Sequence, residues 1–231
     1  MTSSKVALIT GGASGMGLAV AQTLAPKGWT VHLLDFNKAA GVAAAQSLPN
    51  SQFHQVDVTS WKSLSGVFAK AFSYQTVRVT YKSNYQYPSQ YCPIYSASKA
   101  GVIHFMRSIA FPYHHTSGIR VYATCPGTVR TNLMNADEWT TFPEAYFTPI
   151  SRVASAVEML VEGGDMTDAW GRTVHEGENY GLAVEINADN VYFRDGTEFC
   201  DEAMRVVIGA TSMENHLARL EEHKAQQNGG L

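Results

Sequence analysis

The sequence predicts an α/β fold in which a doubly wound parallel sheet is flanked by helices. Three observations support this prediction. Short apolar runs alternate with helical segments, a glycine-rich loop directly follows the first run, and an acidic residue, Asp35, ends the second run. Alternating strands and helices form right-handed βαβ units, which place their strands parallel to one another in one sheet.

Three strand–helix pairs are expected in the N-terminal part of the chain. Each predicted strand is a short apolar or alternating run, and a helical pattern follows it. The strands are expected over 5–10, 29–35 and 52–58, and the helices over 15–26, 37–47 and 60–72.

The C-terminal part continues this alternation with longer connections. Strands are expected over 76–80, 118–125 and 182–187, and helices over 94–110, 150–162 and 212–224. No repeat or low-complexity linker divides the 231 residues, so one domain is expected. It would comprise a cofactor-binding half over 1–75, a catalytic and substrate half over 76–225, and a disordered tail over 226–231.

The composition excludes several classes of protein. The net charge of −3 comes from 17 basic and 20 acidic residues spread along the chain, which argues against nucleic acid or a membrane surface as a partner. Cys92, Cys125 and Cys200 are far apart, so neither disulfides nor a metal site is expected, and Cys125 is interpreted as a buried structural thiol. The N-terminus has no signal-peptide layout, and no apolar run approaches the length of a membrane span. A cytoplasmic location is the expectation.

The glycine-rich loop is the first candidate binding element. The sequence TGGASGMG covers residues 10–17, between a predicted strand and a predicted helix. Glycines in such a turn let the backbone approach a pyrophosphate, which the free N–H groups and dipole of the helix N-terminus stabilise. A dinucleotide is therefore expected here, and the alternative is an ordinary strand-to-helix turn. The expected contacts come from Thr10, Gly11, Ser14, Gly15, Met16 and Gly17.

Two further acidic positions bear on the cofactor. Asp35 lies 18 residues after Gly17, where a carboxylate accepts hydrogen bonds from both ribose hydroxyls of NAD and repels the extra phosphate of NADP. NAD is therefore the expected cofactor, and NADP is not excluded. Asp57 and Val58 are expected to end the third strand and to face the adenine. Asp57 also fits the N-cap of the next helix, a role for which Thr59 competes.

Four motifs occur in the order found in short-chain dehydrogenases/reductases. They are TGGASGMG, Asp57 with Val58, YSASK at 95–99 and PGTVRT at 126–131. The chain resembles this family over most of its length, and its 183–205 segment is similar to fungal members near the hydroxyprostaglandin dehydrogenase group. The resemblance implies a Rossmann-like sheet and an NAD(P)(H)-dependent oxidoreductase that interconverts a secondary alcohol and a ketone. The implied substrate is a small apolar molecule, of the kind made in secondary-metabolite biosynthesis.

The resemblance assigns catalysis to the YSASK segment. Tyr95 would exchange a proton with the substrate oxygen while hydride passes to or from the nicotinamide. A free phenol has a pKa of about 10, too high for a good base near neutral pH. Lys99 lies one helical turn further on the same face, so its ammonium group can stabilise the phenolate and also hydrogen-bond the nicotinamide ribose.

The PGTVRT segment resembles the family loop at the nicotinamide. Pro126 and Gly127 would turn the chain, and Val129 and Thr131 match the positions that contact the carboxamide. All four are expected to bind the cofactor. The alternative is a plain Pro-Gly turn.

The chain departs from the family between Asp57 and Tyr95, which are only 38 residues apart. The family has an Asn-Asn-Ala-Gly strand, a long helix and a serine-bearing strand in this interval, and one crossover alone needs about a dozen residues. One central strand and its helix are therefore expected to be missing. Lys82 stands where the family spacing places the catalytic serine, so the neighbouring Ser83 is the expected third catalytic residue.

The shortening leaves three interpretations open. The chain is an active enzyme, a catalytically impaired dinucleotide-binding protein, or a truncated gene product. The family is usually homo-oligomeric, and the absent helix supplies much of the usual dimer face.

Overall fold

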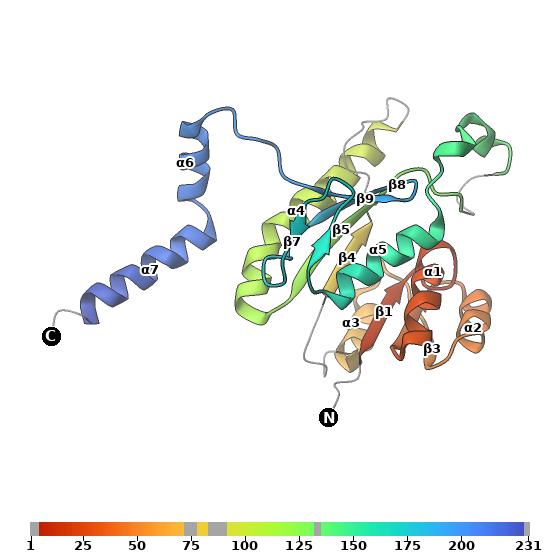
Figure 1. Ribbon diagram of the computed structural model, residues 1–231. Coiled ribbons are helices and arrows are strands. Elements are labelled where there is room, and N and C mark those ends of the chain that lie inside the picture. Colours follow the sequence, from red (N-terminus) through yellow and green to blue (C-terminus); the bar gives the residue numbers. More distant parts are fainter. Residues whose placement is uncertain (1–4, 72–77, 83–91, 132–134, 229–231) are drawn as a thin grey trace.

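The computed structural model describes residues 5–71, 78–82, 92–131 and 135–228, and it contains two main sheets (Figure 1). The first sheet has three parallel strands in the order β1-β2-β3. They are β1 Val6–Thr10, β2 Thr30–Asp35 and β3 Ser51–Gln55. Helix α1 Gly15–Leu24, extended by the 3-10 turn η1 Ala25–Lys27, and helix α2 Lys38–Gln46 cover one face of this sheet.

Burial explains why this face is closed. Val31 and Leu33 of β2 have no exposed surface, and they pack in one cluster with Leu24 of α1 and Ala44 of α2. Successive side chains of a strand point to opposite faces, so Val31 and Leu33 share one face of the sheet, and α1 and α2 cover that face.

β3 is shorter than the sequence suggested. It ends at Gln55, so the expectation that Asp57 and Val58 end this strand is wrong. The Asp57 carboxylate accepts hydrogen bonds from the backbone N–H and the hydroxyl of Thr59, which form a local turn beyond the sheet. Ser60 then caps helix α3, Trp61–Ala71, by accepting a hydrogen bond from the Ser63 N–H.

The second sheet has the strand order β4-β5-β8-β9. β4 Arg78–Lys82, β5 Arg120–Pro126 and β8 Ala183–Asn187 are parallel, whereas β9 Asn190–Arg194 returns antiparallel to β8. Between β5 and β8 lie η2 Glu138–Thr141, η3 Glu144–Tyr146, helix α5 Ile150–Glu162 and the small hairpin β6 Met166–Thr167 with β7 Thr173–Val174.

Helix α4, Pro93–Ser117, connects β4 to β5 and continues seven residues beyond its predicted end at 110. Pro112 lies inside it, although proline removes a backbone donor and disfavours a helix interior. The helix ends at Gly118, whose φ of 64° and N–H bond to the His114 carbonyl form a left-handed C-cap. Because α4 returns from the end of β4 to the start of β5, its N-terminus lies at the carboxyl edge of the sheet.

The central sheet is interrupted between β1 and β4, where a strand was expected to be missing. Among the described strands, β1 pairs only with β2, and β4 pairs only with β5. None of the five residues of β1 is buried, whereas six of the seven residues of β5 are. The predicted parallel sheet flanked by helices is therefore confirmed, and none of the described strands lies between β1 and β4.

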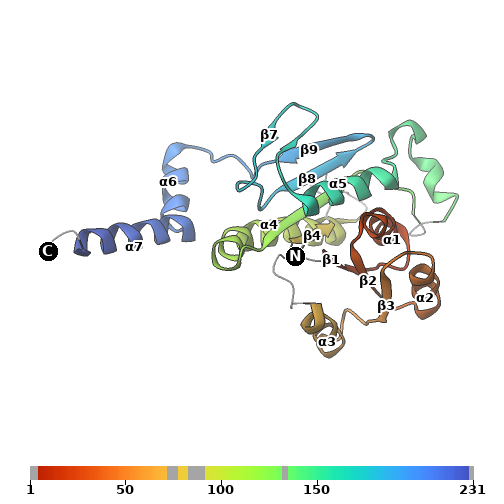
Figure 2. The same ribbon diagram turned by 60° about the horizontal axis from the view of Figure 1, so that its bottom comes forward.

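Helix packing joins the two sheets in place of strand pairing. α1 lies against α5 (Figures 1 and 2), and Met16 of α1 packs on the cluster that contains Val153 and Leu160 of α5. The indole N–H of Trp29 donates to a carboxylate oxygen of Glu162 at 2.9 Å. These contacts hold the N-terminal sheet to the helix that covers the second sheet.

The C-terminal helices α6 Glu202–Ala210 and α7 Met213–Asn228 extend away from the sheets (Figures 1 and 2). α6 has no buried residue. α7 includes residues 226–228, which were expected in a disordered tail, and residues 229–231 lie outside the described part of the chain.

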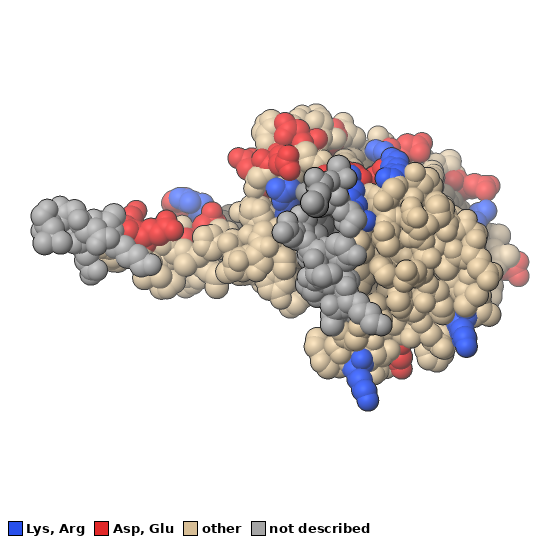
Figure 3. Space-filling view, turned by 90° about the horizontal axis from the view of Figure 1, so that it is seen from below, with Lys and Arg blue, Asp and Glu red and all other residues tan. Residues whose placement is uncertain are grey.

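Part of the N-terminal half exposes apolar side chains. Phe36, Val58 and Trp61 are 71%, 60% and 81% exposed. Viewed from below, the N-terminal side of the molecule carries few charged side chains (Figure 3). Within the described residues, no helix combines the length and apolar character needed to cross a membrane.

Candidate active site

The glycine-rich loop has the geometry of a ligand cradle. Gly11 and Gly15 adopt φ values of 66° and 53°, a region that favours glycine. A Cβ on Gly11 would meet no atom within 4 Å, and one on Gly15 would only touch the Thr131 methyl group at 4.0 Å. Both positions therefore border open space. Gly17 is different, because a Cβ there would lie 2.3 Å from the Gly11 carbonyl oxygen, so it allows α1 to begin close to the loop.

The start of α1 completes this cradle. Ser14 occupies the N-cap in an extended conformation, and its side chain makes no capping hydrogen bond. A hydroxyl and a helix N-terminus at one loop are suited to an anionic group such as a pyrophosphate. Residues Thr10 to Gly17 thus fit the phosphate-binding role that their sequence predicts.

Asp35 lies beside this loop at the carboxyl end of β2. One carboxylate oxygen accepts the Ala13 N–H at 3.1 Å, and the other accepts the Asn37 N–H at 3.0 Å. Asp35 is only partly buried, and the neighbouring Phe36 ring is 71% exposed. The arrangement holds a carboxylate next to an exposed aromatic ring, and Phe36 is a site feature that the sequence analysis overlooked.

Asp57 and Val58 lie beyond β3 on the surface. Hydrogen bonds from the hydroxyl and the backbone N–H of Thr59 lower the pKa of Asp57, so its carboxyl group stays ionised. The N-cap of α3 belongs to Ser60, so neither Asp57 nor Thr59 holds that position. The assignment of Asp57 and Val58 to the adenine remains a prediction.

Tyr95 and Lys99 lie together on the first turns of α4. The Lys99 ammonium nitrogen is 5.4 Å from the centre of the Tyr95 ring, as their four-residue spacing predicts. Tyr95 is 42% exposed, and its backbone carbonyl accepts the Ser98 hydroxyl at 2.7 Å. A phenol within reach of solvent and beside an ammonium group can exchange a proton with a bound molecule.

The PGTVRT loop lies at the carboxyl end of β5 and reaches the glycine-rich loop. Thr131 is its contact with Gly15, and Val129 is buried in the cluster against which Met16 packs. Gly127 is tightly enclosed, because a Cβ there would be 3.0 Å from Asn187 Oδ1 and 3.1 Å from Thr148 Oγ1. The two loops therefore form one surface across the interruption of the sheet.

Thr148 fixes this loop and was missed by sequence reasoning. It is buried, its N–H donates to the Thr128 carbonyl at 2.7 Å, and its hydroxyl accepts the Ala188 N–H at 3.0 Å. Its two partners are 20 and 40 residues away in the sequence, so no local pattern marks it.

Other sequence candidates have simpler outcomes. Ser83, the expected third catalytic residue, lies outside the described residues. Cys125 is 2% exposed, and its pKa is raised to about 12 by burial and by the negative charge of Glu185, with Arg107 acting in the opposite direction. It is a buried thiol as predicted. Across the described ranges, no group of three or more His, Cys, Asp or Glu side chains is arranged to hold a metal ion.

The strand and loop pattern matches one protein family. The family model described as short chain dehydrogenase matches residues 5–80 and 76–140, which together cover more than half of the chain. The two matches meet at residues 76–80, in the interval where the sheet is interrupted.

Individual relatives agree with this match. The short-chain dehydrogenase/reductase prx7 of Penicillium rubens is 33% identical over 277 aligned positions, covering 87% of this chain and 98% of the relative. Since 87% of 231 residues is about 201, about 76 aligned positions of that relative have no counterpart here. Human 15-hydroxyprostaglandin dehydrogenase (NAD(+)) is 27% identical over 190 positions, covering 58% of this chain and 71% of the human protein.

A solved structure supports the fold. An actinorhodin polyketide ketoreductase crystallised with NADPH aligns with a TM-score of 0.59 at 21% identity, over 68% of this chain and 90% of that chain. Together with the sequence matches, it shows that the chain belongs to the short-chain dehydrogenase/reductase family.

Proposed function

We propose that the chain is an NAD(H)-dependent oxidoreductase that interconverts a secondary alcohol and a ketone on a small apolar molecule. The family establishes the oxidoreductase class, and the cofactor preference, the reaction and the substrate class are the proposal. The observation that carries it is the position of the Asp35 carboxylate, which accepts the Ala13 N–H from within the glycine-rich loop.

The residues present fit a dinucleotide. Open space at Gly11 and Gly15 admits a pyrophosphate against the backbone, and Ser14 offers a hydroxyl without a capping partner. Asp35 is placed to accept the ribose hydroxyls, and the exposed Phe36 ring supplies an apolar surface for the adenine side. The nicotinamide of the bound cofactor would supply or accept the hydride.

Tyr95 and Lys99 would handle the proton. In reduction the Tyr95 hydroxyl gives its proton to the substrate oxygen, and in oxidation the Tyr95 phenolate oxygen takes the proton of the substrate hydroxyl. Lys99, 5.4 Å from the ring centre, stabilises the phenolate form electrostatically and can reach a ribose hydroxyl. Thr131 and Val129 would orient the nicotinamide, because they lie on the loop that contacts Gly15.

The carboxylate of Asp35 supports a preference for NADH. A phosphate on the adenosine ribose would approach it to about 4 Å, where like charges repel by about 1–4 kcal/mol near a protein surface. The relatives bear both names, since the human relative is named for NAD(+), and the NADP-dependent dehydrogenase clz5 of Cochliobolus lunatus is 36% identical over 78 positions, a third of this chain. Charge at residue 35 is therefore the feature to test.

Calorimetric titration of NADH and NADPH tests this preference. The unmodified chain should bind NADH at least about tenfold more tightly, the factor that corresponds to 1.4 kcal/mol. Asp35→Ser should bring the two dissociation constants together, and the charge-matched control Glu221→Gln, on the distant helix α7, should leave their ratio unchanged. Equal affinities in the unmodified chain would refute the role of Asp35.

The proton-transfer role has its own test. Tyr95→Phe retains the ring and removes the exchangeable proton, so turnover of secondary alcohols should fall below detection while the NADH dissociation constant stays the same. Lys99→Met should weaken both turnover and binding. If Tyr95→Phe turned over substrate at the unmodified rate, the catalytic role of residues 95–99 would be refuted, and the segment would be only the start of α4.

The proposed setting is a single-domain cytoplasmic enzyme. Packing of α1 on α5 across the interruption supports one domain, and the three free cysteines support a reducing compartment. The family is usually homo-oligomeric, but the helix that supplies much of the usual dimer face is the one expected to be missing here. The resemblance to fungal members of the family is the basis for proposing a role in secondary metabolism.

One observation favours a second candidate, a dinucleotide-binding protein with impaired catalysis. Among the described strands, β1 has a neighbour on one side only, and none of its residues is buried. Inserting a family-like segment of about fifty residues after Tyr74, enough for the missing strand and helix, distinguishes the two candidates. A gain in turnover of more than 100-fold at unchanged NADH affinity would identify the unmodified chain as the impaired form, whereas no gain supports an active shortened enzyme.

A further inference from the structure

Among the described residues, the helix that carries Tyr95 and Lys99 has buried side chains only in its later turns. In the described structure, no residue of α4 from Pro93 to Val102 is buried, and the buried residues of the helix are Ile103, Met106 and Ala110. The first three turns, which hold the proposed catalytic pair, therefore project from the packed part of the helix.

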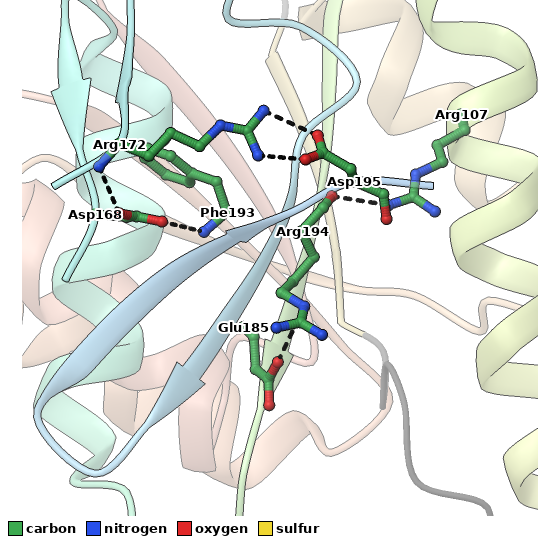
Figure 4. Close-up of polar contacts among 7 residues, drawn as sticks. All are labelled: Arg107, Asp168, Arg172, Glu185, Phe193, Arg194 and Asp195. Carbon is green, nitrogen blue, oxygen red and sulfur yellow. Dashed lines mark hydrogen bonds and ion pairs between the residues drawn. The ribbon is translucent and has the colours of Figure 1, made fainter. Parts of the chain in front are cut away.

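Arg107 ties the packed part of α4 to the outer strand of the sheet (Figure 4). One guanidinium nitrogen donates to the carbonyl oxygens of Arg194 at 2.8 Å and Asp195 at 2.7 Å, at the end of β9. The guanidinium also lies against Gly196, where a Cβ would be 3.9 Å away. Charge-assisted hydrogen bonds of this kind contribute more than neutral ones.

A second layer of contacts fixes the carbonyls that Arg107 holds. The Asp195 carboxylate receives two hydrogen bonds from Arg172, at 2.7 and 2.8 Å. Asp168, only 7% exposed, accepts the backbone N–H groups of Arg172 and Phe193 at 2.9 and 3.0 Å. These bonds fix the end of β9 independently of Arg107.

A hollow of about 480 Å³ beside this network does not indicate a ligand site. It is lined by Trp170, Arg172, Phe193, Arg194, Asp195, Gly196 and Thr197. Its charged groups pair within the protein, Arg172 with Asp195 and Arg194 with Glu185. None of the predicted site residues lines it.

We propose that Arg107 is a positioning residue that sets the angle of α4, and so the place of Tyr95 and Lys99 above the sheet. Twelve residues separate Arg107 from Tyr95, which is about 18 Å along a helix. A tilt of about 3° at Arg107 therefore displaces Tyr95 by about 1 Å. A misplacement of about 1 Å can reduce a rate by about 100-fold.

Spin-label distances test the positioning directly, without relying on turnover. One label is attached to Cys92, the exposed residue just before α4. The other is attached at the start of α2 through Lys38→Cys, and Cys200→Ser removes the other exposed thiol. Arg107→Met removes the donors, and a tilt of about 5° over the roughly 22 Å to Cys92 should broaden or shift the distance distribution by about 2 Å. Arg107→Lys should restore most of the original distribution, and Arg205→Met, which removes an ion pair within α6, should leave it unchanged.

Measurements of kcat complete the test, and they depend on the proposed oxidoreductase function. Arg107→Met should lower kcat at least tenfold and raise the NADH dissociation constant much less, because Lys99 moves with the helix whereas the glycine-rich loop belongs to the other sheet. If Arg107→Met fails to fold, Asp195→Asn loosens the same network more gently.

An unchanged distance distribution in a folded variant overturns the proposal, as does a broadened distribution with unchanged kcat. An unmodified chain without turnover refutes the proposed function instead, and the label distances then decide on Arg107 alone.

Discussion

Replacing Gly17 by alanine tests the closest backbone approach in the candidate cofactor site. The new Cβ would lie 2.3 Å from the Gly11 carbonyl oxygen and 2.8 Å from its carbonyl carbon, and both atoms are backbone. Reaching even 3.0 Å requires a displacement of 0.7 Å, which the loop must supply because no flexible side chain can give way. Overpacking of this kind costs about 1–3 kcal/mol. At about 2–4 °C per kcal/mol for a chain of this size, Tm should fall by about 2–12 °C.

The same displacement should weaken NADH binding, since Gly11 borders the open space assigned to the pyrophosphate. A loss of at least about tenfold in affinity is expected, equivalent to 1.4 kcal/mol. Gly101→Ala is the matched control, because its Cβ would meet nothing within 4 Å on an exposed helix position. It should raise Tm slightly, as alanine is favoured over glycine in a helix by about 1 kcal/mol. Circular dichroism and calorimetry measure both quantities, and wild-type values of Tm and affinity in Gly17→Ala would refute the reasoning.

Two further predictions concern titrating groups. The pKa of His32 is lowered below its unfolded value, mainly by burial, so its stabilising contribution is complete above about pH 6.5 and is lost as pH falls through the folded pKa. His32→Gln should flatten the decline of unfolding free energy between pH 7 and 5. His114, whose pKa is also lowered, is present in both proteins and contributes equally to both curves. Parallel curves for the two proteins would contradict the prediction. Maleimide at pH 7.5 should label Cys92 and Cys200 in the folded chain and Cys125 only after unfolding, because burial raises its pKa to about 12. Rapid labelling of all three thiols would show that the β5 core is open.

Local sequence patterns predicted most of the elements because their signals are local. α5 has the predicted bounds of 150–162, and β1, β2 and α2 differ from prediction by one residue at each end or less. β9 was overlooked because the turn before it contains no glycine. Ala188 and Asp189 form this two-residue turn, and Ala188 adopts a φ of 47°, which is unusual for alanine. Helix α6 did carry a usable signal, since Asp201 caps it by accepting the Met204 N–H.

The candidate site divides in the same way. Tyr95 and Lys99 meet because helical spacing brings them together, and Asp35 lies at the loop because parallel strands end at one edge. Arg107 depends on a strand 87 residues later, and Thr148 depends on β8, so tertiary packing alone reveals their roles. The predicted strand end was wrong because β3 ends at Gln55, and the Asp57 carboxylate forms a turn by accepting the Thr59 N–H.

The interruption between β1 and β4 shows which shortenings this architecture can absorb. Each strand runs to the carboxyl edge, and the following helix carries the chain back to the amino edge. Removing a strand together with its helix returns the chain to the same edge, so the next strands can still pair in parallel, as β4, β5 and β8 do. Removing a strand alone would reverse the polarity of everything after it. Viable length changes in such proteins should therefore come in whole strand–helix units, and gene variants that differ by half a unit should be rare.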